Sequence, residues 1–262
     1  MKILVAGLGK SGTTVLYSRI KNTRPDLVPC RFEPRVQDLT GDEGLIKTLV
    51  CESRPDCDLF NHGVYDSFEK RVFIVRDPRD RLISGLLYHA ATARFDDRFG
   101  GDPDSKEEFM KRLKQKEEDP RSVSLAELSK HITYNKNGKP YATDMIECTI
   151  KYDHYLVKYE DFVKDDVAGL EEYLGFELTG SNDVGIFTRV IRSKRAGNWR
   201  NWFTPADVEL CSPVFTPFMR FFGYDTEDWE LATEPVIEPE LSTEYIERTW
   251  HGWINNHENR HD

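Results

Sequence analysis

The spacing of apolar residues along the chain predicts a sheet of short buried strands. Several short runs combine apolar and β-branched side chains and are bounded by Gly, Pro or polar turns, a pattern typical of strands. The predicted strands are residues 3–6, 28–32, 58–61, 72–75 and 155–159.

Helical patterns lie between and after these strands. The predicted helices are residues 13–20, 44–50, 81–93, 106–116, 124–131 and 167–174. Strands that alternate with helices predict an α/β fold, with one central parallel β-sheet flanked by helices on both faces. Ligands of such sheets bind beyond the carboxyl ends of the strands, where loops lead into helix N-termini.

Two stretches depart from this alternation. Residues 92–151 are charged and helical in pattern, with the turn sequence Asn-Lys-Asn-Gly at 135–138, and predict a helical insertion. We expect this insertion to belong to a single α/β domain over residues 1–229, because no internal repeat and no long linker occurs. Residues 230–262 predict an acidic strap and a short helix packed on the domain, docked by Trp250 and Trp253.

Composition and charge narrow the class of protein. The chain has 262 residues, of which 39% are hydrophobic and 31% charged, which suits a globular domain and excludes disorder, collagen and coiled coil as the whole chain. The net charge of -10 is concentrated in residues 225–262, which hold eleven acidic and two basic side chains. The near-neutral body predicts no broad attraction to nucleic acid or membranes, but leaves room for a local cluster of cations around one anion.

The sequence also indicates where the protein is located and whether it binds a metal. No apolar run reaches the ~20 residues of a membrane helix, and the first apolar run is too short for a signal peptide, which predicts a soluble, cytoplasmic protein. The five cysteines form no Cys-x-x-Cys pair, which favours reduced thiols over a disulfide scaffold or a zinc site. The histidines show no ligand spacing, so no metal is expected.

The first candidate site is the loop after the first strand, with the sequence Gly-Leu-Gly-Lys-Ser-Gly-Thr-Thr at 7–14. Glycines let the backbone wrap around an anion, a helix N-terminus presents free N–H groups, and the lysine and hydroxyls add charge and donors. These features predict a phosphate cradle; the alternative is a turn that only packs helix on strand. Leu4 stands where a Walker A loop has its first glycine, which weakens a kinase assignment. The predicted binding residues are Gly9, Lys10, Ser11, Gly12, Thr13 and Thr14.

Two further basic segments follow. Arg76 comes at the tip of the strand at 72–75, and Ser84 lies about two turns along the next helix, so that a cation and a hydroxyl can share one phosphate. The alternative is an ordinary salt-bridged helix surface. Residues 192–204 are basic and aromatic together, and we interpret them as a clamp over a small anion rather than a surface for RNA or a protein partner.

With three phosphate-directed segments in this order, the sequence resembles the sulfotransferases that use 3′-phosphoadenosine 5′-phosphosulfate (PAPS), which have a P-loop NTPase-like fold. The family's K-x-G-T-T segment, which holds the 5′-phosphosulfate, is similar to residues 10–14, and its Arg and Ser for the 3′-phosphate have the spacing of Arg76 and Ser84. The family's late clamp resembles residues 192–200, and its Tyr-Glu-Asp segment implies that Tyr159 lies near the adenine. Within the late clamp, the resemblance implies nucleotide contacts from Arg192, Arg195 and Gly197. Ser193, Lys194 and Asn198 depart from the family's pattern, so the cation that touches the 3′-phosphate is left open.

The resemblance implies transfer of a sulfuryl group from PAPS to a hydroxyl or amine acceptor by in-line displacement, with release of 3′,5′-diphosphoadenosine (PAP) and without a metal. Lys10 is then expected to stabilise charge on the departing phosphate. Two residues compete to be the base. Glu33 resembles the Glu-Pro and Glu-x-Arg features of two branches of the family, and His62 resembles the catalytic His of the cytosolic branch. Glu33 is preferred, and an ion pair with its neighbouring arginines is the alternative.

Two other functions compete with this interpretation. A P-loop kinase would use Mg-ATP through Lys10 and Ser11, but its metal would need an aspartate at a strand end, and Asp58 begins its predicted strand. A module that binds PAP without catalysis would keep Lys10, Arg76 and Ser84 and transfer nothing. The acceptor, whether a small molecule, a glycan or a peptide, and the oligomeric state are left open by the sequence.

Overall fold

A computed structural model describes residues 1–50, 63–92, 104–128, 141–185 and 195–258. The chain forms two compact units that interleave in sequence. Met1–Asp77 and Ala142–Gly185 make the first unit, and Pro78–Tyr141 and Ile186–Asp262 make the second. The division into residues 1–229 and 230–262 stays a prediction.

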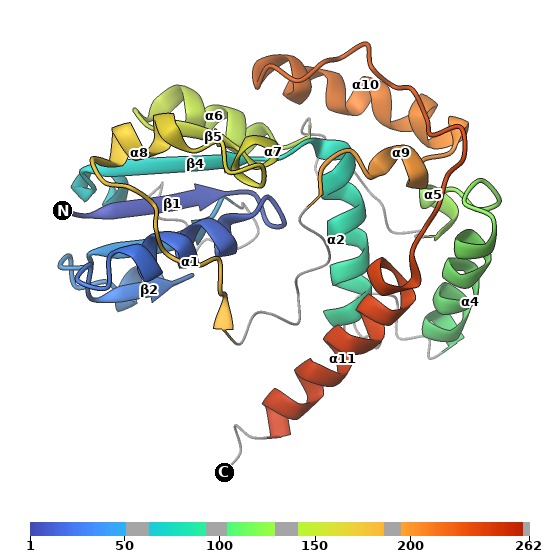
Figure 1. Cartoon of the computed structure of the whole chain (residues 1–262), viewed down its shortest axis with the longest axis horizontal. Coiled ribbons are helices and arrows are strands. Elements are labelled where there is room, and N and C mark those ends of the chain that lie inside the picture. Colours follow the sequence, from blue (N-terminus) through green and yellow to red (C-terminus); the bar gives the residue numbers. More distant parts are fainter. Residues whose placement is uncertain (51–62, 93–103, 129–140, 186–194, 259–262) are drawn as a thin grey trace. The chain divides into compact units, whose positions relative to one another are not determined.

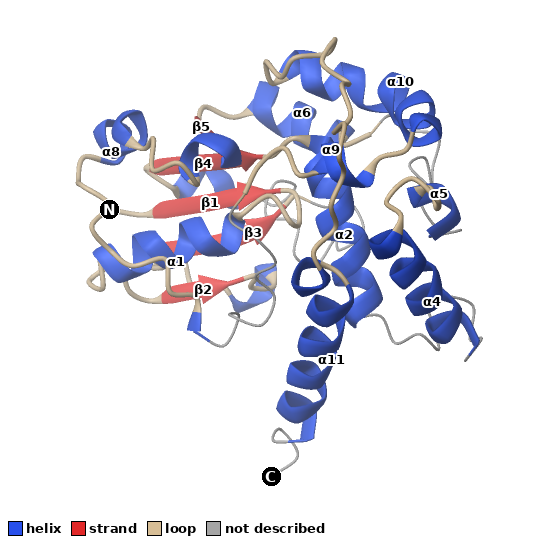
Figure 2. Cartoon of the chain, turned by 45° about the vertical axis from the view of Figure 1, so that its right-hand side comes forward, coloured by secondary structure: helices blue, strands red, loops and turns tan. Residues whose placement is uncertain are grey.

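The first unit is built on one parallel sheet in the order β2-β3-β1-β4-β5, which confirms the predicted α/β fold with a single parallel sheet. Figure 2 shows the strands in this order from bottom to top. β3 and β4 lie on opposite sides of β1, so the loop after β1 is at the point where the winding of the sheet reverses, a common ligand site. The strands are β1 Ile3–Gly7, β2 Cys30–Phe32, β3 Leu45–Leu49, β4 Lys70–Val75 and β5 Tyr155–Lys158.

Apolar side chains from the strands and from three helices form the core of this unit. Ile3 and Val5 of β1, Leu16 of α1 and Leu170 of α8 belong to one buried cluster, so α1, α7 and α8 pack on the sheet. α1 begins directly after the loop that follows β1, and the core therefore holds its N-terminus at the strand end (Figure 1). The described helices of this unit are α1 Thr13–Thr23, α6 Thr143–Lys151, α7 Tyr159–Phe162 and α8 Ala168–Leu174, with 3₁₀ turns η1 Val36–Asp38 and η3 Val64–Ser67.

The second unit is helical. Its buried cluster includes Trp199, Trp202 and Phe215, and α11 packs against α2, as Figure 1 shows. Thr204 and Asp207 form a reciprocal capping box at the start of α10. The described helices are α2 Pro78–Thr92, α4 Asp104–Glu118, α5 Leu125–Leu128, α9 Trp199–Trp202, α10 Pro205–Phe221 and α11 Thr243–Glu258, with the 3₁₀ turn η5 Pro239–Leu241. None of the helices in the described ranges is long and apolar enough to cross a membrane.

The structure corrects one prediction and leaves another outside its range. The helix predicted at 44–50 is wrong, because Leu45–Leu49 is the strand β3, paired on both sides with β1 and β2. Lys47 and Thr48 break the apolar run in the sequence, yet both side chains are buried in the sheet. The strand predicted at 58–61 lies outside the described residues.

Candidate functional site

The loop between β1 and α1 has the backbone geometry of an anion cradle. Lys10 and Gly12 both adopt left-handed conformations, with φ of 69° and 95°, and the chain enters α1 at Thr13. A left-handed lysine is uncommon and strained, and such residues concentrate at functional sites. No side chain caps α1 and its first turn contains no acidic residue, so its first N–H groups have positive partial charge to offer.

Two buried polar atoms, one in this loop and one next to it, could each donate a further hydrogen bond. Ser11 is 0% exposed and Arg76, directly after β4, is 5% exposed. Among the residues that the structure describes, neither Ser11 Oγ nor Arg76 Nε has a hydrogen-bond partner. Unsatisfied buried donors are rare because each costs about 1–3 kcal/mol. A phosphate oxygen is a suitable acceptor for either atom.

Arg76 and Tyr159 form one side of the cradle. The Arg76 guanidinium lies 4.3 Å from the centroid of the Tyr159 ring, and its Nη1 donates to the Lys10 carbonyl oxygen over 3.3 Å. A Cβ atom added to Gly12 would lie 2.5 Å from Tyr159 Cδ2, so only glycine fits there. Tyr159 thus packs against both Arg76 and the loop at Gly12. Its contact with adenine stays a prediction.

Ser84 and the described part of the late clamp belong to the second unit. Ser84 is buried on α2, and the start of the same helix provides Asp80, which is fully buried. Asp80 accepts hydrogen bonds from the backbone N–H groups of Gly197 and Trp199, at 2.6 and 2.9 Å. A buried carboxylate on α2 therefore holds the late segment, an interaction that the sequence analysis did not predict.

Other predicted contacts of the late segment are partly outside the structure. Arg195 is exposed and its Nη1 lies 3.4 Å from Glu238 Oε1, in an ion pair with the acidic strap. Exposed pairs of this kind contribute little to stability. Arg192 and the alternative base His62 lie outside the described residues.

Glu33 lies at the carboxyl end of β2, where the cradle loop follows β1 at the same edge of the sheet. β3 separates β2 from β1, which places the two strands roughly 10 Å apart. Glu33 has a left-handed φ of 48°, and its N–H donates to the Lys47 carbonyl oxygen at 2.8 Å. Its carboxylate forms an ion pair with the Lys47 ammonium, a partner that the sequence analysis missed because it predicted a helix at 44–50.

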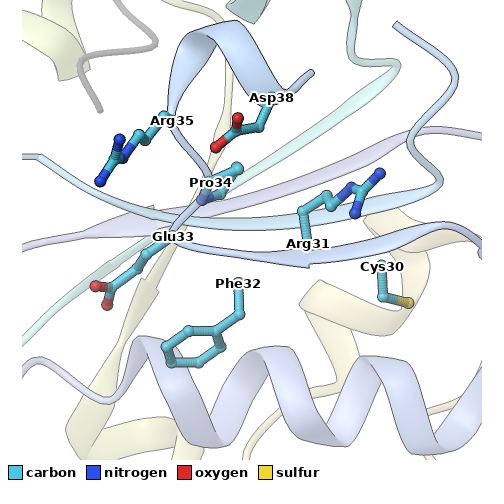
Figure 3. A pocket seen from close by; sticks show the side chains of 7 residues that line it. All are labelled: Cys30, Arg31, Phe32, Glu33, Pro34, Arg35 and Asp38. Atoms are coloured by element: carbon cyan, nitrogen blue, oxygen red, sulfur yellow. The ribbon is translucent and has the colours of Figure 1, made fainter. Parts of the chain in front are cut away.

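A cavity of about 630 Å³ opens beside Glu33. Figure 3 shows the Glu33 and Arg35 side chains toward the left of the view and those of Arg31 and Cys30 toward the right. Burial raises the pKa of the Cys30 thiol, which disfavours a nucleophilic thiolate in this cavity. The lining residues are Cys30, Arg31, Phe32, Glu33, Pro34, Arg35 and Asp38.

Within the described parts of the chain, no three His, Cys, Asp or Glu side chains are grouped as metal ligands would be. The expectation that the reaction needs no metal stays a prediction.

Comparisons with known proteins were made for the whole chain. No protein-family model matches it, and no curated protein does. Among solved structures, the chain is similar to mouse sulfotransferase SULT7A1 complexed with PAP, at 16% identity and a TM-score of 0.49, with 84% of each chain covered. That neighbour is a sulfotransferase.

Proposed function

We propose that this protein is a sulfotransferase that moves the sulfuryl group of PAPS to a hydroxyl or amine acceptor and releases PAP. The observation that carries the proposal is the pair of buried, unpartnered donors, Ser11 Oγ and Arg76 Nε, beside the left-handed Lys10 loop. Donors that are buried before a ligand binds have already lost their hydration, so a phosphate gains charge-assisted hydrogen bonds at little further cost.

The residues of the cradle suit the two anionic ends of the nucleotide. The 5′-phosphosulfate is proposed to be held by Lys10, by the hydroxyls of Thr13 and Thr14, and by the first N–H groups of α1. Arg76 is proposed to hold the 3′-phosphate. The nucleotide contacts of Ser84, Arg195 and Gly197, which belong to the second unit, stay predictions from the sequence.

PAPS supplies a sulfuryl group already activated by its bond to a phosphate. Glu33 is proposed to accept the proton of the acceptor hydroxyl as the acceptor oxygen bonds to sulfur, while the bond from sulfur to the phosphate oxygen breaks and its electron pair stays on that oxygen. The Lys10 ammonium stabilises the charge that develops there. Positioning and charge stabilisation thus account for most of the catalysis.

Three observations support Glu33 as the base. The residue lies at the carboxyl end of its strand, the same end of the sheet as the cradle. It lines a cavity large enough for part of an acceptor, and its backbone is strained. His62 remains the alternative base.

The test is transfer of ³⁵S from labelled PAPS to representative phenols, glycans and peptides carrying hydroxyl groups. We expect at least one acceptor class to be labelled, and Lys10→Ala to reduce the rate about 100-fold or more. Parallel assays with Mg-ATP labelled at the γ-phosphate test the kinase alternative. Phosphoryl transfer, or PAP binding with no transfer to any acceptor, would contradict the proposed function and favour the kinase or the non-catalytic module.

A further inference from the structure

Lys47 is a cation in the interior of the sheet. It lies in β3, in register with Val5 of β1 and Phe32 of β2, and is 2% exposed. Burying an ammonium is costly unless it is paired, and a hydrophobic residue would fill a sheet interior at lower cost. A lysine at this position therefore calls for an explanation beyond packing.

Lys47 holds Glu33 through two contacts. Its ammonium pairs with Glu33 Oε1, and its carbonyl oxygen accepts the Glu33 N–H at 2.8 Å. The ammonium also lies 4.4 Å from the centroid of the Phe32 ring, which packs edge-on against Tyr17 of α1 at 5.7 Å. The core thus holds the Lys47 ammonium in place, and the ammonium holds the Glu33 carboxylate.

We propose that Lys47 is a positioning residue for the base: it orients the Glu33 carboxylate toward the cavity. This inference rests on the proposed function, in which Glu33 is the base. The two contacts fix the direction of the side chain, because one holds the Glu33 N–H and the other holds its carboxylate.

Other charged groups around Glu33 have a different setting. Arg31, Arg35 and Asp38 line the same cavity, and Figure 3 shows Glu33 toward the left of the view and Arg31 toward the right. Arg35 is exposed, so solvent and salt screen its attraction to the carboxylate more than that of the buried Lys47. We therefore assign the positioning of Glu33 to Lys47.

The first experiment compares Lys47→Met, Lys47→Arg and wild type by ³⁵S transfer from PAPS and by calorimetry with PAP. For Lys47→Met we expect turnover to fall about 10- to 100-fold while the KM for the acceptor stays within about twofold, because a misdirected carboxylate slows proton removal without weakening binding. PAP affinity should stay within about twofold, because the nucleotide is held by other residues. Lys47→Arg keeps a cation that can pair with Glu33 and should recover most of the turnover.

Lys70→Met is the matched control. Lys70 is also a strand lysine over an aromatic ring, 4.7 Å from the centroid of Tyr173. It differs from Lys47 because it begins β4, at the amino end of the strand, whereas the cradle lies at the carboxyl ends. Its removal should leave turnover and the KM for the acceptor unchanged.

A second measurement separates positioning from stability. Removing both members of a buried ion pair leaves no unpaired charge, so the double variant Glu33→Gln/Lys47→Met should fold even if Lys47→Met alone does not. Once Glu33 is replaced, loss of Lys47 should reduce the residual turnover no further. A further loss of tenfold or more in the double variant, or a Lys47→Met enzyme with the wild-type rate, would overturn the role of Lys47 and leave the proposed function standing. Failure of the wild type to transfer sulfate while it binds PAP would instead refute the proposed function, and the catalytic role of Lys47 with it.

Discussion

Replacement of Arg76 by alanine tests how the nucleotide is recognised. The side chain is almost fully buried, stacks on Tyr159 and reaches the Lys10 carbonyl oxygen, while its Nε has no partner among the described residues. The proposed partner of Nε is the 3′-phosphate. PAP carries that group and 5′-AMP does not, so the two nucleotides separate this contact from the rest of the site.

The structure sets the size of each effect. Loss of a charge-assisted contact to the 3′-phosphate costs about 1.5–3 kcal/mol, which raises the Kd for PAP about 10- to 150-fold. The 3.3 Å hydrogen bond to Lys10 is long, and its loss loosens the loop that serves both nucleotides. Its donor is charged, but at 3.3 Å the bond is long, so we expect its loss to cost about 1 kcal/mol or less and the Kd for 5′-AMP to rise no more than about fivefold.

Isothermal calorimetry with PAP and 5′-AMP measures both effects on the same protein. Arg71→Ala is the matched control, because Arg71 lies in β4, the strand that Arg76 follows, but donates to the Tyr65 carbonyl oxygen, away from the cradle. It should change neither affinity. Equal losses for PAP and 5′-AMP in the Arg76→Ala protein would refute the assignment of Arg76 to the 3′-phosphate and leave it only a support of the loop.

Three further predictions address the base, the loop and an internal lysine. Glu33→Gln should lower turnover about 100-fold with PAP affinity nearly unchanged, and an unchanged rate would remove it as the base. Gly12→Ala should lower the free energy of unfolding in urea by about 1–3 kcal/mol, since the new Cβ meets Tyr159 at a left-handed φ; Gly9→Ala, with open space around its Cβ, is the control, and equal stability of the two variants would contradict this. Burial lowers the pKa of Lys116 from 10.5 to about 8, so between these pH values the unfolded state binds more protons and the free energy of unfolding rises with pH. Lys116→Met should remove that rise, and parallel pH dependences for variant and wild type would exclude it.

The first strand, the cradle loop and α1 were predictable because their signals are local. An apolar run, a loop of glycines with lysine and hydroxyls, and an amphipathic stretch follow one another directly in residues 3–23. Each of these signals depends on neighbours within a few residues. The parallel sheet followed from their alternation with helices.

The elements that were missed depend on distant partners or on exceptions to local rules. β3 contains Lys47, whose burial is explained by Glu33, a residue 14 positions earlier in the chain. α10 was not predicted because Pro213 and Pro217 lie inside it, and proline usually ends a helix. The contact between Asp80 and Gly197 joins residues 117 positions apart, and no local sequence pattern predicts it.

A crystal structure of the protein with PAP tests the central claim most directly. The account predicts that the 5′-phosphate lies on the loop at 9–14 within hydrogen-bond distance of Ser11 Oγ, and that Arg76 Nε donates to the 3′-phosphate. A nucleotide bound elsewhere, or bound at the loop with both of these atoms still without a partner, would contradict it.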